Sequence, residues 1–236
     1  MNVIIFGATG MVGQSALHAS LLDPDVGQVL AVVRTPTGVK HPKVREVLLD
    51  DFADLTPIED ELVGYDACFY CLGVSSVGLE EAAYTRVSYE YPVAAAHTLV
   101  KINPDMTFVY VSGGGTDPSS RQMWARVKGR TENAVIETFR NGYAFRPGMV
   151  QPTFPATSKT NLFRTVYALT APVFPLLERI APQYAITTDR LGRAMLHAAR
   201  TGFPQHIVEN RDLCRSRSRM PRSRPPRPQH LRATDA

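Results

Sequence analysis

The sequence predicts an α/β fold with a doubly wound, mostly parallel sheet, and two observations indicate this class. The first is a series of short apolar runs, each followed by a glycine or polar turn and then by residues with helical periodicity. The second is a series of glycines directly after the first apolar run, at residues 3–6. A chain of 236 residues is long enough for one such domain with a sizeable core.

The glycines that follow the first expected strand have a G-x-x-G-x-x-G spacing and precede an expected helix. Glycine permits a tight turn and lets the backbone approach a pyrophosphate without a Cβ in the way. The free N–H groups and the positive dipole end of the helix then face the phosphates. We therefore predict a dinucleotide site here, with an ordinary glycine turn as the alternative. Its expected residues are Gly7, Thr9, Gly10, Met11, Val12 and Gly13.

The second strand is expected at residues 28–33, and Arg34 follows it about twenty residues after the glycine series. An NAD-specific site usually has an acidic residue at this position, where it binds the ribose 2′-hydroxyl. A guanidinium instead binds a 2′-phosphate through charge-assisted hydrogen bonds. Arg34 therefore predicts NADP(H) in preference to NAD(H), with a solvated surface arginine as the alternative.

Two further strands are expected at residues 44–49 and 66–72. Asp50 and Asp51 follow the first of them, where a carboxylate can accept a hydrogen bond from the adenine amino group. The alternative is a polar start of a loop. Ligands of open parallel sheets lie outside the carboxyl ends of the strands, so the end of the strand at residues 66–72 is predicted to contact the cofactor. The residues there are Cys71, Leu72 and Gly73.

The later elements continue the alternation of strand and helix. They are expected at residues 80–101 (helix), 106–111 (strand), 121–140 (helix), 143–148 (strand), 187–200 (helix) and 205–210 (strand). Residues 149–183 depart from this pattern, being rich in proline, threonine and aromatic residues. We expect them to form a small lid or lobe on the substrate side, with a dimer surface or an interfacial membrane contact as alternatives.

The basic character of the chain lies in its last residues. From Leu213 onward there are seven arginines and one acid, which account for the formal net charge of +4. This Arg/Ser/Pro composition cannot bury enough apolar surface to fold. We expect a domain at residues 1–212, which binds no nucleic acid, and a disordered tail at 213–236. The tail is either an untypical chain end or a basic arm for acidic partners.

The three cysteines indicate a reducing compartment. Cys68 and Cys71 lie three apart in one expected strand and so face opposite sides, which predicts two packed thiols and neither a disulfide nor a metal-ligand pair. No metal site is expected. The low cysteine count and the lack of a signal-peptide pattern predict a cytoplasmic protein. The most apolar later stretch, residues 162–180, contains prolines and charges, so no transmembrane segment is expected.

The chain resembles the atypical short-chain dehydrogenases/reductases, which have an NAD(P)-binding Rossmann fold. Within them it is similar to the Tat-interacting-protein-like and NmrA-like groups and to bacterial NAD-dependent epimerase/dehydratase-type proteins. The resemblance covers residues 1–212 and rests on the glycine series, Arg34, residues 71–73, and Ser112 with Lys128. It implies an oxidoreductase or epimerase-type enzyme that acts on a small carbonyl or sugar-like substrate.

The resemblance also implies roles for single residues. In the family a serine orients the carbonyl, a tyrosine is the acid/base, and a lysine four residues later lowers the tyrosine pKa and holds the nicotinamide ribose. Ser112 and Lys128 match the serine and the lysine, although a solvated helix lysine is the alternative for Lys128. Pro147 and Gly148 match the backbone near the nicotinamide carboxamide.

The tyrosine position is occupied by Trp124. An indole N–H is a donor that does not release its proton, so the family mechanism cannot be transferred whole. Trp124 is expected to pack on the nicotinamide or to close the pocket, and Tyr84 or a water are candidate acids. Two functions therefore stay open: an NADP(H)-dependent enzyme with a modified site, and a non-catalytic NADP(H)-sensing regulator with a protein partner. A homodimer is compatible with both.

Overall fold

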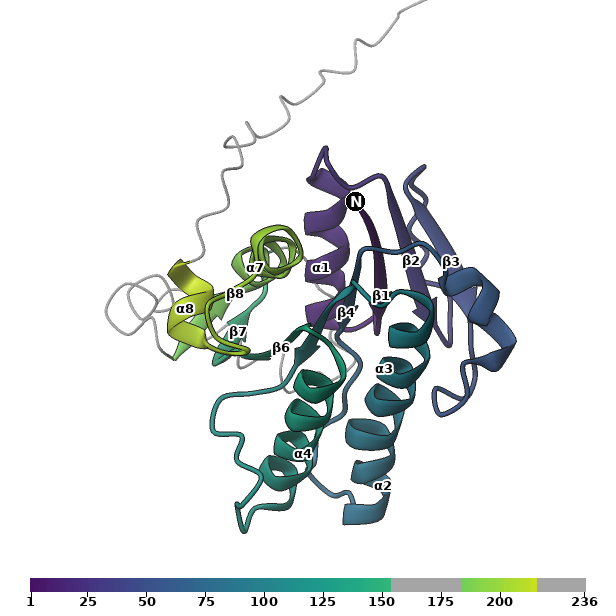
Figure 1. The fold of residues 1–236 in the computed structure, drawn as a ribbon. Helices are drawn as coiled ribbons and strands as arrows, with labels where there is room; N and C mark the ends of the chain where they lie inside the picture. Colours follow the sequence, from purple (N-terminus) through teal and green to yellow (C-terminus); the bar gives the residue numbers. More distant parts are fainter. Residues whose placement is uncertain (154–183, 216–236) are drawn as a thin grey trace, which may run out of the picture.

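The computed structural model describes residues 1–153 and 184–215, which are built around a seven-stranded sheet whose neighbouring strands are all parallel (Figure 1). The strand order β3-β2-β1-β4-β5-β6 is that of dinucleotide-binding sheets, and β9 is added at one edge. The predicted doubly wound α/β class is confirmed. The strands are β1 (Asn2–Phe6), β2 (Gln28–Val33), β3 (Val44–Leu48), β4 (Ala67–Tyr70), β5 (Thr107–Val111), β6 (Asn141–Arg146) and β9 (Ile207–Glu209).

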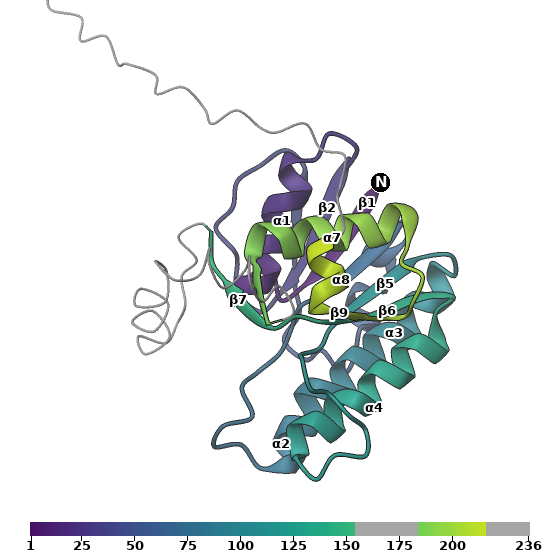
Figure 2. The ribbon, with the colours of Figure 1, turned by 90° about the vertical axis from the view of Figure 1, so that its left-hand side faces the viewer.

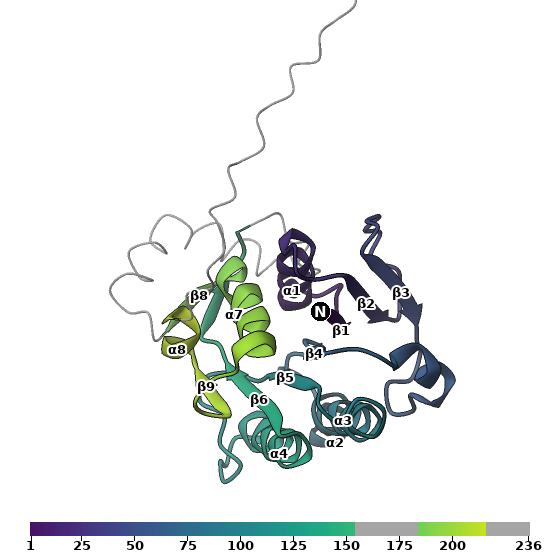
Figure 3. The same ribbon diagram turned by 45° about the horizontal axis from the view of Figure 1, so that its top comes forward.

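Helices cover both faces of the sheet (Figure 3). One face carries α1 (Met11–Leu22) and α7 (Thr188–Thr201), and Figure 2 is viewed from this side. The other face carries α3 (Tyr91–Ile102), α4 (Met123–Thr138) and the 3₁₀-helix η1 (Thr56–Leu62). Helix α7 lies so close to α1 that a Cβ added to Gly192 would be 2.5 Å from the Ser15 carbonyl oxygen. None of the described helices is long and apolar enough to cross a lipid bilayer.

Each central strand contributes side chains to two separate cores. Val3 and Ile5 of β1 pack on the α1 and α7 side, whereas Ile4 and Phe6 pack on the α3 side. A strand that is buried on both faces needs an uninterrupted apolar run, which is the pattern seen in the sequence. Cys68 belongs to the α3-side core and Cys71 packs against the other core, and both are free thiols. Their predicted opposite orientation is thus confirmed.

The expected single helix at residues 80–101 is interrupted. It consists of α2 (Glu81–Thr85), a π-helical turn η2 (Arg86–Glu90) and α3. A π turn contains more residues than an α turn, so it changes the phase of the helix face that points inward. The periodicity of the sequence does not show such a local insertion.

The chain around the expected lid and the expected tail is partly described. β7 (Met149–Gln151) pairs in parallel with β8 (Ala185–Thr187), and helix α8 (Asn210–Arg215) follows β9. Helix α8 continues past residue 212, the predicted end of the folded domain. Its Leu213 is buried and packs into the α1-side core. The remaining residues of the lid and the tail, 154–183 and 216–236, lie outside the described ranges.

Candidate active site

The glycine turn, residues 7–13, is a backbone structure that leaves no room for side chains at two positions. Gly7 has a φ of +79°, and a Cβ there would be 2.7 Å from the Leu72 backbone nitrogen. A Cβ on Gly13 would be 2.0 Å from the Gly7 carbonyl oxygen, whereas on Gly10 the same atom would be 3.4 Å away. Glycine at 7 and 13 therefore lets the turn pack directly on the end of β4 and on helix α1.

The amino end of α1 presents free backbone donors beside this turn. The Gly10 amide donates to the Gly7 carbonyl at 3.0 Å, and the Gln14 side chain donates to the Thr9 carbonyl at 3.2 Å. Among the described residues no side chain caps α1, and its first turn contains no acid, which leaves a positive helix end suited to an anion. A diphosphate fits this cradle. The amides available to it are those of Met11, Val12 and Gly13.

A cavity of about 370 Å³ lies at the carboxyl ends of β4, β5 and β6, next to the glycine turn. This is the place where ligands bind in doubly wound sheets. The cavity brings together many of the predicted residues from distant parts of the chain. Its lining consists of Val12, Cys71, Leu72, Gly73, Val74, Val111, Ser112, Gly113, Lys128, Pro147, Gly148 and Val150. Val111 and Val150 were not predicted, because nothing in the sequence distinguishes them from other strand valines.

The Ser112–Lys128 wall, formed by Ser112, Gly113, Thr116 and Lys128, is held by side-chain hydrogen bonds. Lys128 Nζ donates to the Ser112 carbonyl at 2.9 Å. Ser112 Oγ lies 3.0 Å from Thr116 Oγ1, and Thr116 Oγ1 donates to the Gly113 carbonyl at 2.8 Å. The Ser112 and Thr116 hydroxyls therefore hydrogen-bond to each other beside the Gly113 carbonyl, and either can be the donor of that bond.

The half-buried Lys128 lies near a buried ion pair. Burial lowers the pKa of the Lys128 ammonium to about 8, while the Glu132 carboxylate one turn away acts to raise it. Glu132 itself forms a bidentate pair with Arg146, with Nε–Oε1 and Nη2–Oε2 distances of 3.0 and 2.6 Å. Arg146 also donates to Glu209 of β9 at 3.0 Å. The pair ties α4, β6 and β9 together behind the wall.

Pro147 and Gly148 are fixed by contacts with two other segments. The Gly114 amide donates to the Pro147 carbonyl at 3.1 Å, and the Gly148 amide donates to Asn210 Oδ1 at 2.8 Å. A Cβ on Gly148 would be 2.3 Å from the Tyr184 carbonyl oxygen. Asn210 was not predicted as a site residue, because its contact bridges 62 positions of the sequence.

No family model matches the sequence. Among curated proteins, the chain is similar to protein HTATIP2 of Rattus norvegicus, with 28% identity over 152 residues that cover 63% of this chain and 62% of that protein. It is also similar to the protein named FMP52-2, mitochondrial, of Scheffersomyces stipitis, with 30% identity over 154 residues that cover 63% and 66%. The chain spans 52% to 66% of the lengths of the curated relatives it matches.

Solved structures share the fold over most of the chain. Yeast methylglyoxal/isovaleraldehyde reductase Gre2, complexed with NADPH, has a TM-score of 0.67 and 15% identity, covering 89% of this chain and 78% of that chain. Bordetella bronchiseptica WbmF, in complex with NAD⁺, has a TM-score of 0.65 and 17% identity, covering 91% and 76%. The fold is also shared with a short chain dehydrogenase family protein of Francisella tularensis, with a TM-score of 0.63 and 12% identity, covering 88% of this chain and 95% of that chain. The resemblance predicted from the sequence is confirmed at this level.

Three residues expected at the adenosine side of a short-chain dehydrogenase site lie outside the cavity. Arg34 is exposed after β2 and has no ion pair or hydrogen bond within the ranges that the structure describes. Asp51 accepts from the Ala53 amide and from Arg86 Nη2, each at 3.1 Å. Asp50 is exposed and has no such partner in the described part of the chain. Asp50 is thus the freer of the two predicted adenine acceptors.

Neither Trp124, at the position of the family tyrosine, nor the candidate acid Tyr84 lines the cavity. Trp124 lies on α4 and does not line the cavity; its ring end, Cη2, is 3.7 Å from where a Cβ on Gly115 would be. Tyr84 is 2% exposed and is also absent from the lining. Burial raises the pKa of its phenol. The structure therefore gives no support to Tyr84 as a substitute acid.

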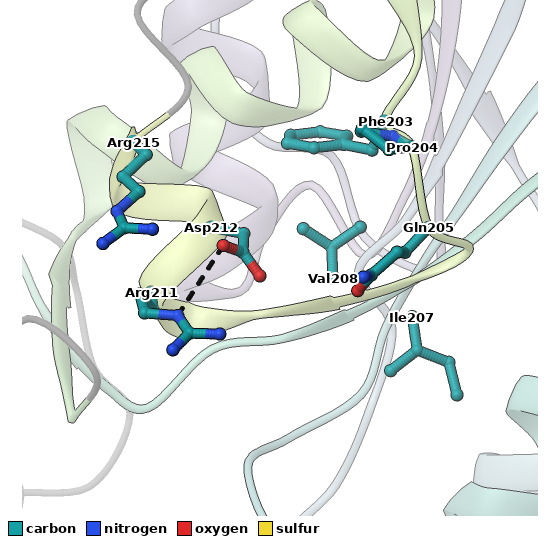
Figure 4. A pocket seen from close by; sticks show the side chains of 8 residues that line it. All are labelled: Phe203, Pro204, Gln205, Ile207, Val208, Arg211, Asp212 and Arg215. Atoms are coloured by element: carbon teal, nitrogen blue, oxygen red, sulfur yellow. Dashed lines mark ion pairs between the residues drawn. The ribbon is translucent and has the colours of Figure 1, made fainter.

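A second cavity, of about 330 Å³, lies beside β9 and α8, away from all predicted site residues (Figure 4). It is lined by Phe203, Pro204, Gln205, Ile207, Val208, Arg211, Asp212 and Arg215. Its arginine side chains are solvated, and Arg211 Nε lies 3.8 Å from Asp212 Oδ1. Within residues 1–153 and 184–215, no group of three or more His, Cys, Asp or Glu residues could hold a metal ion.

Proposed function

We propose that this chain binds NADP(H) and acts as an oxidoreductase or epimerase-type enzyme on a small carbonyl or sugar-like substrate. The observation that supports this most directly is the single cavity that joins the end of the glycine turn to Ser112 and Lys128. A reduced nicotinamide bound there would supply a hydride. The amides at residues 11–13 would hold the diphosphate, and Lys128 with residues 71–73 would contact the nicotinamide ribose.

The preference for NADP(H) rests on Arg34. Its guanidinium is exposed directly after β2 and is not engaged by a carboxylate in the described ranges. It is therefore available for bidentate bonds to a 2′-phosphate. The solved structures of similar fold include complexes with NAD⁺ and with NADPH, so only the residues of this chain can indicate the preference.

The test is a titration followed by a turnover screen. NADPH should bind tighter than NADH, and NADPH should be consumed with at least one member of a panel of aldehydes, ketones and nucleotide sugars. Lys128→Ala should abolish any turnover that is found. No binding of either nucleotide would overturn the proposal, and unchanged turnover in Lys128→Ala would overturn the role of Lys128.

The second candidate function is an NADP(H)-binding regulator without turnover. Two observations favour it: Trp124 occupies the tyrosine position, and the Ser112 hydroxyl is already hydrogen-bonded to Thr116. This function predicts nucleotide binding without consumption. It also predicts a protein partner whose affinity for this chain changes when NADPH is added.

The compartment and assembly of the chain are also proposals. The cysteines form no disulfide within the described residues, which is compatible with a cytoplasmic protein. A homodimer, and a folded domain that binds no nucleic acid, are the states we propose. Size-exclusion chromatography with light scattering and a nucleic-acid titration test them.

A further inference from the structure

Reduction of a carbonyl needs a proton donor, and few groups at the cavity carry an exchangeable side-chain proton. Most of the described lining consists of Val, Leu, Gly and Pro residues. The exceptions are Cys71, Ser112 and Lys128. Among the described residues, these three are therefore the candidate proton donors.

Two of the three groups are poor donors. The Ser112 hydroxyl is a weak acid, and its oxygen shares a hydrogen bond with Thr116 Oγ1 at 3.0 Å. Burial raises the pKa of the Cys71 thiol far above its usual value, so it releases its proton reluctantly. Neither group offers a proton that is both free and readily released.

The third group, the Lys128 ammonium, has N–H donors that are not used within the described ranges. An ammonium has three N–H donors, and the hydrogen bond of Nζ within the described ranges is the one to the Ser112 carbonyl. Two donors are thus available at the lining of the cavity. Because Lys128 Nζ is held by the residue that follows β5, its head is fixed beside Ser112.

We infer that Lys128 itself donates the proton to the substrate oxygen, in place of the tyrosine that Trp124 replaces. This inference rests on the proposed function and differs from the family pattern, in which the lysine assists a tyrosine. The carbonyl carbon accepts the hydride that the nicotinamide supplies, and its oxygen takes the C=O electron pair. The oxygen then takes a proton as an Nζ–H bond breaks and an O–H bond forms. The neutral amine regains a proton from water.

The surroundings of Lys128 suit this role. Burial lowers the pKa of its ammonium to about 8, near the working pH at which a general acid is most effective. The charged groups behind it are Glu132 of α4, Arg146 of β6 and Glu209 of β9, and Cys71 lines the same cavity. Glu132 accepts a bidentate hydrogen bond from Arg146, and its effect of raising the Lys128 pKa is smaller than the lowering by burial.

The first test measures the titration of Lys128 in the nucleotide-free protein. Lysines are labelled by reductive methylation with ¹³C-formaldehyde and followed by NMR between pH 6 and 11. We expect one resonance to titrate near pH 8, and to vanish in Lys128→Arg but not in the matched exposed control Lys101→Arg. Titration of the Lys128 resonance above pH 10 would overturn the inference.

The second test uses chemical rescue. Lys128→Ala should lose at least 100-fold in turnover, and added ethylamine or methylamine should restore part of it, with the rescued rate depending on the pKa of the amine. Lys128→Arg should lose turnover although it keeps a positive charge at this position, since a guanidinium does not release its proton. Turnover in Lys128→Arg with the wild-type pH profile would overturn the inference. Failure of the wild type to bind NADPH would instead overturn the proposed function.

Discussion

The glycine turn and the Ser112–Lys128 wall meet at one cavity but are held in place by different means. The turn depends on backbone contacts, with a hypothetical Cβ at Gly13 only 2.0 Å from the Gly7 carbonyl oxygen. The wall depends on side-chain hydrogen bonds and on the buried Glu132–Arg146 pair behind it. A diphosphate can be bound by backbone amides alone, whereas proton transfer needs particular side chains.

This difference explains how the proposed nucleotide cradle can be kept while the proposed reaction site changes. Substitution of Trp124 for tyrosine changes a side chain on α4 and leaves the turn untouched. The cradle therefore predicts nucleotide binding whether or not the wall supports turnover. Substitutions confined to the turn or to the wall therefore affect the two parts separately.

The largest effect is expected from Gly13→Ala. Its Cβ would meet the backbone of Gly7, which cannot move without displacing the turn from the end of β4. We expect no measurable NADPH binding and a loss of more than about 4 kcal/mol in the free energy of unfolding. Fluorescence titration and urea denaturation measure both. Gly10→Ala is the control, with a 3.4 Å contact and a cost below about 1 kcal/mol. Equal effects would contradict the backbone account.

The second-largest effect on stability is expected from Glu132→Ala, which breaks the ion pair behind the Ser112–Lys128 wall. The Glu132 side chain is 1% exposed and that of Arg146 is 15% exposed, so the substitution leaves a largely buried guanidinium without its main partner. We expect a loss of about 3 kcal/mol in unfolding free energy. Glu209→Ala removes the exposed partner of the same arginine and should cost less than about 1 kcal/mol. Urea denaturation distinguishes the two, and similar losses would argue against a buried pair.

Arg34→Ala tests the cradle without touching the wall. We expect NADPH affinity to fall about 10- to 100-fold, as is typical when a charge-assisted bond to a phosphate is lost. NADH affinity and turnover with NADH should stay unchanged, because NADH lacks the 2′-phosphate. Isothermal titration calorimetry with both nucleotides measures the difference. A parallel loss for NADH would mean that Arg34 acts on something other than the 2′-phosphate.

The pH dependence of stability tests the burial of Lys128. Burial lowers its pKa to about 8 in the folded protein, whereas the unfolded chain keeps a value near 10. The unfolded state therefore binds more protons between these values, and stability rises with pH in that window. Relative to Lys128→Met, the wild type should gain on the order of 1–2 kcal/mol between pH 7.5 and 9.5. Urea denaturation at both pH values measures this, and a constant difference would contradict it.

The smallest effect is expected from Asp51→Asn. The side chains of Asp51 and Arg86 are 52% and 55% exposed, so their ion pair should be worth less than about 1 kcal/mol. Because Asp51 is already engaged, nucleotide affinity should stay within about twofold. Asp50→Asn should weaken binding more, since Asp50 is the free candidate for the adenine amino group. The reverse order in a nucleotide titration would assign the adenine contact to Asp51.

Much of the fold could be predicted because its signals are local. The apolar runs gave the strands, and β2 (Gln28–Val33) begins and ends at the predicted residues. The π turn at Arg86–Glu90 escaped prediction, since a single extra residue within a helical turn leaves no mark in the periodicity. Helix α8 was also missed, because its stability comes from burying Leu213 and not from its own polar composition.

The sequence by itself determined the sheet class and the glycine turn. The reason is that strand burial, helical periodicity and tight turns depend on neighbouring residues. Only the tertiary structure decided which polar groups are free and which are engaged: Ser112 is bound to Thr116, and Asp51 to Arg86. Hydrogen-bond partners in a folded chain are chosen by spatial proximity, and for Asp51 and Arg86 this joins positions 35 residues apart.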